Sequence, residues 1–194
     1  MTHDGPGRLA DFLFEALMLK RTPRTGYQFL GHGSETVAEH SFGVAVLAFA
    51  LVRLNGQADL MRTLKLALFH DLAEARTGDL NYMNKRYTET DEGRAMTDAL
   101  SGLPFGPELM ENWREWRAGE TLEAQLAADA DQLDMVLELR RLHTLGSAQA
   151  RDWLHYAQKR LQTPEGRTLF EEIVKTDPER WWFERRDDYW VKKP

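Results

Sequence analysis

The feature that most constrains this chain is a His-Asp pair, His70–Asp71, at the end of an apolar helical pattern. Apolar residues keep helical spacing before the pair, at Leu60, Leu64, Ala67 and Leu68. Asp71 follows on the same stripe, so the pattern predicts one helix over Leu60–Thr77, ended by Gly78, with Asp71 directed inward. An unpaired buried carboxylate costs several kcal/mol. The pair therefore predicts an ion pair or a metal ion, with a solvated helix end as the alternative.

A second histidine is predicted to lie beside this pair. Thr36 and Glu39 have the spacing of a capping box, which starts a long apolar helix that runs to about residue 54. His40 shares the buried stripe of that helix one turn inside its start. The Asn55–Gly56 turn is short, so this helix and the next should run antiparallel. The start of one then lies next to the end of the other, which brings His40 to His70.

A third long helix, over 120–144, contains three acids that cannot all face one way: Asp129, Asp131 and Asp134. Asp131 has small residues one turn before it and Met135 one turn after, which leaves room for an ion. In the helix predicted over 107–117, Trp113 and Trp116 pack onto the core or cover a pocket. Further helices are predicted over 8–20, 93–103, 148–161 and 163–175. We therefore expect an all-α fold.

Composition restricts the chemistry of any site. The chain has no cysteine, so a metal must be held by imidazole and carboxylate, which favours a hard or borderline divalent ion. The segment 20–27 concentrates three cations around a proline and a glycine, and such a loop suits an anion. The chain should run extended from there to Gly33.

Length and charge restrict the class of protein. The 194 residues predict one domain, with a core over about 8–145 followed by C-terminal helices and an aromatic tail over 146–194. We expect that tail to staple helices or to form a subunit contact. A net charge of −6 without a long basic run argues against a nucleic-acid partner. The apolar segment Leu9–Leu19 is interrupted by Asp11 and Glu15, so we expect no membrane partner and a cytoplasmic location.

His40, His70–Asp71 and Asp131 form the ordered pattern H…HD…D, which resembles the HD-domain metal-dependent phosphohydrolases. The surrounding motifs are similar to the 5′-deoxynucleotidase branch, over roughly 19–139: LKRTPRTGY at 19–27, VAEH at 37–40, HDLAE at 70–74, TGDL at 77–80 and DQ at 131–132. The resemblance implies an all-α helical bundle with one buried divalent metal ion, of which Mn, Co, Mg, Zn and Fe are not distinguished. It also implies a homodimer.

The resemblance also implies residue roles. His40, His70, Asp71 and Asp131 match the metal ligands. Glu74 is expected to activate water, Arg24 to bind the phosphate of a nucleoside monophosphate, and Asp79 to lie near the sugar. In the bacterial members an aromatic residue directly follows the arginine and packs on the deoxyribose, whereas here Thr25 and Gly26 precede Tyr27. The resemblance therefore supports phosphatase chemistry more than selection of the 2′-deoxy sugar.

The predicted activity is removal of the 5′-phosphate of (deoxy)ribonucleoside monophosphates by a metal-activated water, with Glu74 and Asp79 as catalytic residues and Arg24, Tyr27 and Asp79 in contact with substrate. Two alternatives remain. One is an HD-type di-iron oxygenase, for which the sequence offers no clear extra ligands. The other is a non-enzymatic HD protein that binds nucleotides.

Overall fold

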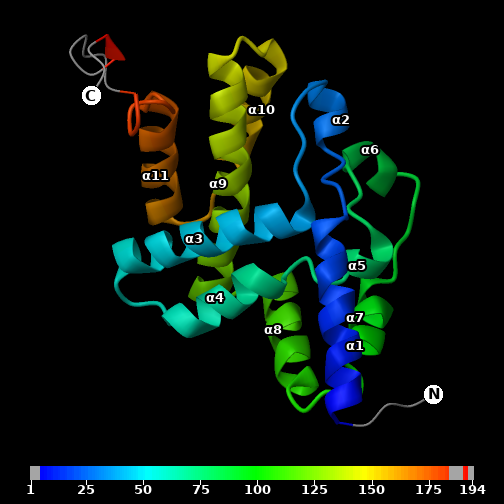
Figure 1. Ribbon diagram of the computed structural model, residues 1–194. Helices are drawn as coiled ribbons and strands as arrows, with labels where there is room; N and C mark the ends of the chain where they lie inside the picture. Colours follow the sequence, from blue (N-terminus) through cyan, green and yellow to red (C-terminus); the bar gives the residue numbers. More distant parts are fainter. Residues whose placement is uncertain (1–4, 184–189, 192–194) are drawn as a thin grey trace.

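The computed structural model describes residues 5–183, 190 and 191, and every regular element within them is a helix. In chain order the elements are α1 (Pro6–Ala16), the 3-10 helix η1 (Leu17–Lys20), α2 (Tyr27–Leu30), α3 (Val37–Asn55), α4 (Leu60–Phe69), α5 (Glu74–Thr77), α6 (Tyr82–Lys85), α7 (Glu92–Leu100), α8 (Gly106–Ala118), α9 (Leu122–Thr144), α10 (Ala148–Gln158) and α11 (Pro164–Lys175). In Figure 1, α3 crosses α9 near the middle of the molecule, with α10 and α11 beside α9 above it and α1, α7 and α8 below. The all-α prediction is confirmed.

Buried apolar side chains form two clusters. The larger cluster joins α3, α4, α9, α10 and α11, and the smaller joins α1, η1, α7, α8 and the pair Leu72–Ala73. Val37 belongs to the smaller cluster and Val44 to the larger, so His40 lies between them on α3. His70 likewise lies between Ala67 of the larger cluster and Ala73 of the smaller. Both histidines therefore lie where the two clusters meet.

Helix α3 begins as its sequence predicts. Both halves of the capping box form: the Thr36 side chain accepts from the Glu39 amide, and the Glu39 side chain accepts from the Thr36 amide. The helix ends at Gly56, whose φ of 75° favours glycine. By length and composition alone α3 could cross a membrane, but it packs against α4 and α9, and a core helix passes the same test.

The prediction of one continuous helix over Leu60–Thr77 is wrong for the middle of that range. α4 ends at Phe69, turns cover 70–73, and α5 begins at Glu74. The Leu72 amide donates to the Phe69 carbonyl and the Glu74 amide donates to the Asp71 carbonyl, so tighter turns replace the α-helical ladder. Leu68, placed on the buried stripe, is 47% exposed. Asp71 still faces inward, with 18% of its side chain exposed, and Gly78 ends α5 with a φ of 72°.

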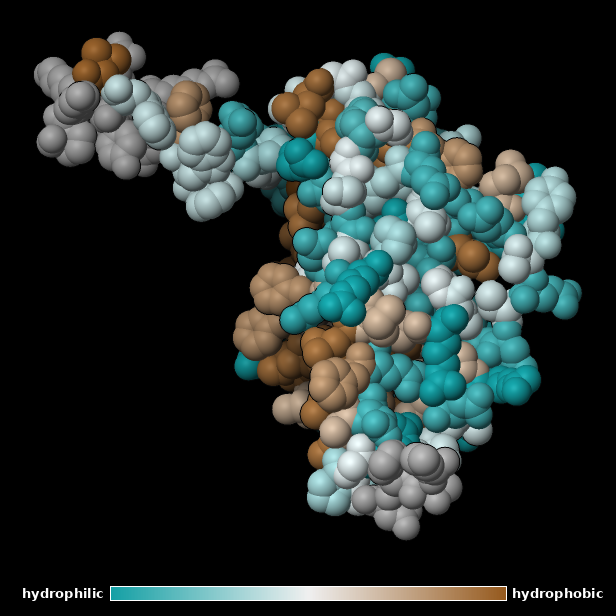
Figure 2. Space-filling model, turned by 45° about the vertical axis from the view of Figure 1, so that its right-hand side comes forward, coloured by the Kyte–Doolittle hydropathy of each residue, from teal (hydrophilic) through white to brown (hydrophobic). Residues whose placement is uncertain are grey.

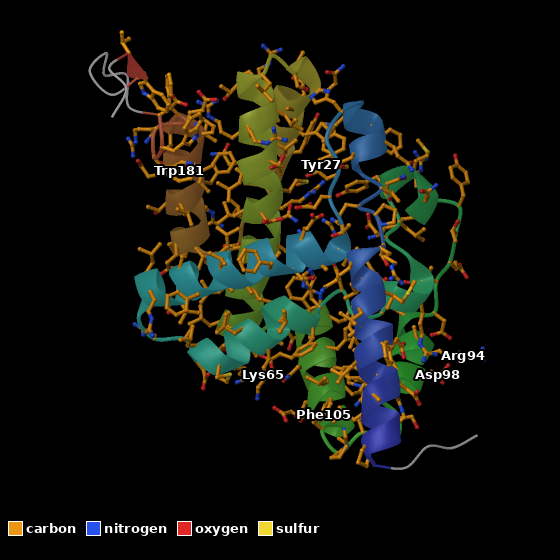
Figure 3. All side chains as sticks on the ribbon, viewed as in Figure 1. Tyr27, Lys65, Arg94, Asp98, Phe105 and Trp181 are labelled. Atoms are coloured by element: carbon orange, nitrogen blue, oxygen red, sulfur yellow. The ribbon has the colours of Figure 1, made fainter. Side chains whose placement is uncertain are left out.

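Other boundaries differ in smaller ways. The segment expected to be extended as far as Gly33 contains α2, and a further short helix, α6, follows Asn81. Beyond α11, Trp181 is 85% exposed, and Figure 3 shows it at the far end of that helix. Stapling of the helices by this residue is therefore wrong. Tyr189, another residue of the predicted aromatic tail, lies outside the described residues.

Candidate functional site

A cavity of about 480 Å³ opens where the two apolar clusters meet, and all of the predicted site residues line it. They come from four regions of the chain: Arg24, Tyr27, His40, His70, Asp71, Glu74, Asp79 and Asp131. Their imidazole rings meet as predicted, because the His40 and His70 ring centroids are 5.5 Å apart. The antiparallel arrangement inferred from the short turn between α3 and α4 thus brings the histidines together.

Each histidine is oriented through its Nδ1 atom. His40 Nδ1 lies 2.7 Å from Asp134 Oδ2, and His70 Nδ1 lies 2.8 Å from the Ala67 carbonyl oxygen. Both partners are acceptors, so each Nδ1–H donates a hydrogen bond, and the neutral form of each ring has its lone pair on Nε2. Both Nε2 atoms are buried, and neither makes a hydrogen bond. Two orphaned nitrogen acceptors are therefore directed into one site.

Two carboxylates face these nitrogens. Asp131 Oδ1 is 3.0 Å from His40 Nε2, and Asp71 Oδ2 is 3.1 Å from His70 Nε2 and 3.8 Å from His40 Nε2. Ligand atoms of His40, His70 and Asp131 all lie within 4.8 Å of one another. Asp71 lies beside this group and also pairs with Arg24. Burial opposes ionisation of Asp71, but His70 lowers the pKa of its carboxyl below the ordinary value.

This set of donors fits a divalent cation. Two neutral imidazole nitrogens and two carboxylates would offset its charge and leave coordination positions for water or a phosphate oxygen. Burial lowers the pKa of His40, but Asp131 and Asp134 raise it to about 10. The same negative field that attracts a proton to Nε2 attracts a cation, so metal and proton compete for this atom.

Arg24 lies next to the metal-binding group. Its Nη1 is 3.3 Å from Asp71 Oδ2. Burial would lower the pKa of Arg24, but Asp71 and Asp131 raise it above the ordinary value, so the guanidinium stays charged. A guanidinium beside a metal-binding group provides paired donors for a phosphate.

Glu74, at the start of α5, points a buried oxygen into the same cavity. Its Oε2 has no hydrogen-bond partner. Burial raises the pKa of Glu74 to about 9, and repulsion from Asp71 and Asp79 acts in the same direction. A cation held beside Asp71 would offset that repulsion and lower the pKa of Glu74.

Asp79 and Tyr27 line the cavity in different ways. Asp79 Oδ2 accepts from the Thr25 amide at 2.6 Å, so Asp79 holds the backbone that follows Arg24. The Tyr27 hydroxyl donates to Glu35 Oε2 at 3.5 Å, and Figure 3 shows Tyr27 between α2 and α9. Both residues therefore line the cavity and also have a partner within the protein. The sequence offered no sign of the contact between Asp79 and Thr25.

The sequence did not single out two other contacts of the histidines. Asp134 binds His40, as described above. Trp116 packs against the core and also lines the cavity, with its ring centroid 4.7 Å from that of His70, so both uses predicted for it apply. Asp129, the remaining one of the three aspartates of α9, lies away from the site. It accepts hydrogen bonds from the Gln162 and Thr163 amides before α11. The one sequence signal that could have identified Asp134 is its spacing, about one turn after Asp131 on the same helix.

Comparison with known proteins matches this chain to the HD-domain family model over residues 16–173. It is 33% identical over 142 residues to the human protein 5′-deoxynucleotidase HDDC2, with 69% of this chain and 68% of the relative covered. The bovine HDDC2 protein is 32% identical over 144 residues, with 71% of this chain and 69% of the relative covered.

Solved structures share the fold. A conserved hypothetical protein from Pyrococcus furiosus superposes with a TM-score of 0.72 at 30% identity, with 86% of this chain and 99% of that chain covered. The HD phosphohydrolase DatZ of cyanophage S-2L, whose structure contains dA and one catalytic Zn²⁺, superposes with a TM-score of 0.55 at 24% identity, with 84% and 95% covered. The helical arrangement around the cavity is therefore a shared one.

Proposed function

The chain belongs to the HD-domain family, and from this premise we propose that it is a metal-dependent phosphohydrolase that removes the 5′-phosphate of deoxyribo- and ribonucleoside monophosphates. One observation carries the proposal. Two buried histidine Nε2 atoms without hydrogen-bond partners face two carboxylates, and an arginine lies beside one of them. Such a set can hold a cation and a phosphate in contact.

His40, His70, Asp71 and Asp131 would hold one divalent ion. When bound, such an ion would lower the pKa of a water that it holds towards about 7, and so supply a nucleophile at neutral pH. The chain's own part is to keep both Nε2 atoms free, through the contacts of Nδ1 with Asp134 and the Ala67 carbonyl. The deeply buried histidines, 0% and 5% exposed, cannot turn away into solvent.

Arg24 binds the phosphate. Its guanidinium can donate two parallel hydrogen bonds to phosphate oxygens and stabilise the charge on them in the transition state. Glu74 orients the attacking water and takes its proton. Tyr27 contacts the nucleoside, and Asp79 acts near the sugar and through its hold on Thr25. Because the 2′-hydroxyl and the base differ between nucleotides while the 5′-phosphate does not, these roles separate affinity for phosphate from choice of nucleoside.

The alternatives have less support. A di-iron oxygenase needs a second set of free ligands, and a further group of possible ligands does exist: Glu35, His40 and Asp134. It shares His40, whose Nδ1–H donates a hydrogen bond to Asp134 Oδ2 at 2.7 Å, so Nδ1 has no lone pair for a metal. A non-enzymatic nucleotide-binding protein would not need Glu74, whose buried oxygen lacks a partner.

One experiment tests the activity. Metal-free protein is assayed for phosphate release from AMP and dAMP, with Mn, Co, Mg, Zn and Fe(II) added singly. We expect no turnover without metal, and turnover of at least one nucleotide with at least one metal. Phosphate release that is the same with and without metal, or none under any condition, would contradict the proposal. Two irons per chain in metal analysis would favour the oxygenase.

We also propose a homodimer. Exposed apolar side chains gather on α1, α3 and α4: Leu13, Phe14, Phe42, Val46, Phe49 and Leu68. On the face that Figure 2 shows, much of the apolar surface lies toward the left-hand edge of the main body. Exposed patches of this kind mark contact surfaces. Light scattering that gives a monomer mass at micromolar concentration would contradict the dimer.

A single domain, a cytoplasmic location and the absence of nucleic-acid and membrane partners stay predictions. Limited proteolysis, fractionation and binding assays with duplex DNA and lipid vesicles would test them.

A further inference from the structure

Asp134 contacts His40 on the side of the ring that faces away from the cavity. It follows Asp131 by nearly one turn of α9, and its Oδ2 is 2.7 Å from His40 Nδ1. The contact is enclosed, with His40 0% and Asp134 9% exposed. A carboxylate at this distance accepts a hydrogen bond from Nδ1–H, which leaves Nε2 as the acceptor nitrogen of the neutral ring.

Gly43 makes this contact possible. A Cβ atom at Gly43 would lie 1.9 Å from Asp134 Oδ1 and 2.9 Å from its Cγ, distances that require the carboxylate to move. Glycine inside a helix is unfavourable relative to alanine, and Gly43 lies in the interior of α3. The missing side chain opens the space that the Asp134 carboxylate fills between α3 and α9.

The other histidine has a weaker partner. His70 Nδ1 donates to a neutral backbone carbonyl, that of Ala67. A charged acceptor strengthens a hydrogen bond and makes the opposite ring nitrogen a better donor to a metal. The two predicted nitrogen ligands therefore differ in the support that they receive.

We propose that Asp134 is a positioning residue for His40: in the space left by Gly43, it fixes the ring with Nε2 towards the cavity and thereby strengthens divalent-metal binding. This inference rests on the proposed metal site. It assigns Asp134 a task distinct from that of Asp131, whose carboxylate faces Nε2, and from that of Asp129, which holds the segment before α11.

The test measures metal affinity rather than turnover. Metal-free wild type, Asp134→Asn and Asp134→Ala are titrated with Mn²⁺ by calorimetry, at a temperature where circular dichroism shows each to be folded. We expect Asp134→Ala to bind about 10- to 100-fold more weakly, the usual loss for such a partner. Asp134→Asn should lose less affinity than Asp134→Ala, because its amide oxygen can still accept a hydrogen bond from Nδ1–H.

Asp129→Asn is the matched control, since it neutralises another buried acid of the same helix. It should lower the melting temperature and leave Mn²⁺ affinity within about twofold of wild type, a change worth about 0.4 kcal/mol. Gly43→Ala should weaken metal binding while Asp134 is still present. Nitrogen-15 NMR of the metal-free protein, at a pH where the His40 ring is neutral, should find its proton on Nδ1 in wild type and should find this preference lost in Asp134→Ala.

The outcomes separate the two proposals. Wild type that binds no divalent ion would overturn both the proposed function and this inference. Wild type that binds, together with a folded Asp134→Ala of equal affinity, would overturn only the role of Asp134. A loss of affinity in Asp129→Asn as large as that in Asp134→Ala would do the same, because it would point to general destabilisation.

Discussion

The two sides of the site, each with residues that line the cavity and residues behind them, are built differently. The metal side, consisting of His40, His70, Asp71, Asp131 and Asp134, comes from long helices and the tight turn after α4, and its histidines are buried among packed helices. The substrate side, consisting of Arg24, Thr25, Tyr27, Glu35 and Asp79, comes from loops and short helices.

The substrate side is held mainly by hydrogen bonds to backbone. The Thr25 amide donates to Asp79 Oδ2 at 2.6 Å, and the Arg24 amide donates to the Glu35 carbonyl at 2.8 Å. Loops of this kind open more easily than packed helices. Changes on the metal side should therefore abolish the ion and the reaction, whereas changes on the substrate side should alter rate and choice of nucleotide.

The largest effect is expected from Asp71→Ala. It removes the carboxylate that lies closest to His70 Nε2, so metal content and activity should fall to background while helical content is kept. Elemental analysis, phosphate release and circular dichroism measure the three quantities. Asp98→Ala is the control, because Asp98 is an exposed acid labelled in Figure 3 and should change none of them. Full metal occupancy and turnover in Asp71→Ala would remove this residue from the ligand set.

The next effect is expected from Glu74→Ala. Loss of a group that orients and deprotonates water should lower kcat by about 10²-fold or more. The metal content should stay unchanged, because Glu74 lies beyond the ligand group of His40, His70 and Asp131. Steady-state kinetics with parallel metal analysis makes the comparison. An unchanged kcat would exclude Glu74 from the mechanism, and lost metal would move Glu74 to the metal side.

A smaller effect is expected from Arg24→Lys. An ammonium cannot copy the paired contact of a guanidinium with phosphate, so kcat/KM should fall by about 10- to 100-fold, the worth of one or two charge-assisted hydrogen bonds. The fall should be similar for dAMP and AMP, because both present the same phosphate. Arg21→Lys is the matched control, since Arg21 is exposed in the same loop.

The ratio of kcat/KM for dAMP to that for AMP should instead respond to Tyr27→Phe and Asp79→Asn. Tyr27 lines the cavity, and Asp79 holds Thr25 beside it. A ratio that changes strongly with Arg24→Lys and stays constant in the other two variants would reverse the roles assigned to these residues.

The smallest effect is expected on stability, from Glu35→Gln. Burial, with repulsion from Asp134, raises the pKa of Glu35 from 4.5 to about 7. The folded state therefore binds more protons than the unfolded state between these values, and the free energy of unfolding decreases as pH rises through them. Glutamine removes this penalty, so the metal-free variant should melt a few degrees higher at pH 8 and at the same temperature as wild type below pH 4.5. A gain at low pH but not at high pH would contradict the assigned sign.

Much of the fold follows from local signals in the sequence. The capping box at Thr36 and Glu39, the cap at Thr163 and the helical spacing of apolar residues depend only on near neighbours, so α3, α9 and α11 lie close to their predicted ranges. The short turn at Gly56 also accounts for the meeting of His40 and His70. The roles of the site residues stay predictions, although all of those residues line one cavity.

What the sequence by itself determined is therefore the longer helices, such as α3, α9 and α11, their order and the chemical groups available to a site. Tertiary structure alone decided the break after Phe69, the pairing of Thr25 with Asp79, and the separate tasks of Asp129, Asp131 and Asp134. The physical reason is one of range. Caps and periodicity act over a few residues, whereas the partner of a buried acid on α9 depends on which residue of α3 or of the segment before α11 leaves space beside it, as Gly43 does for Asp134.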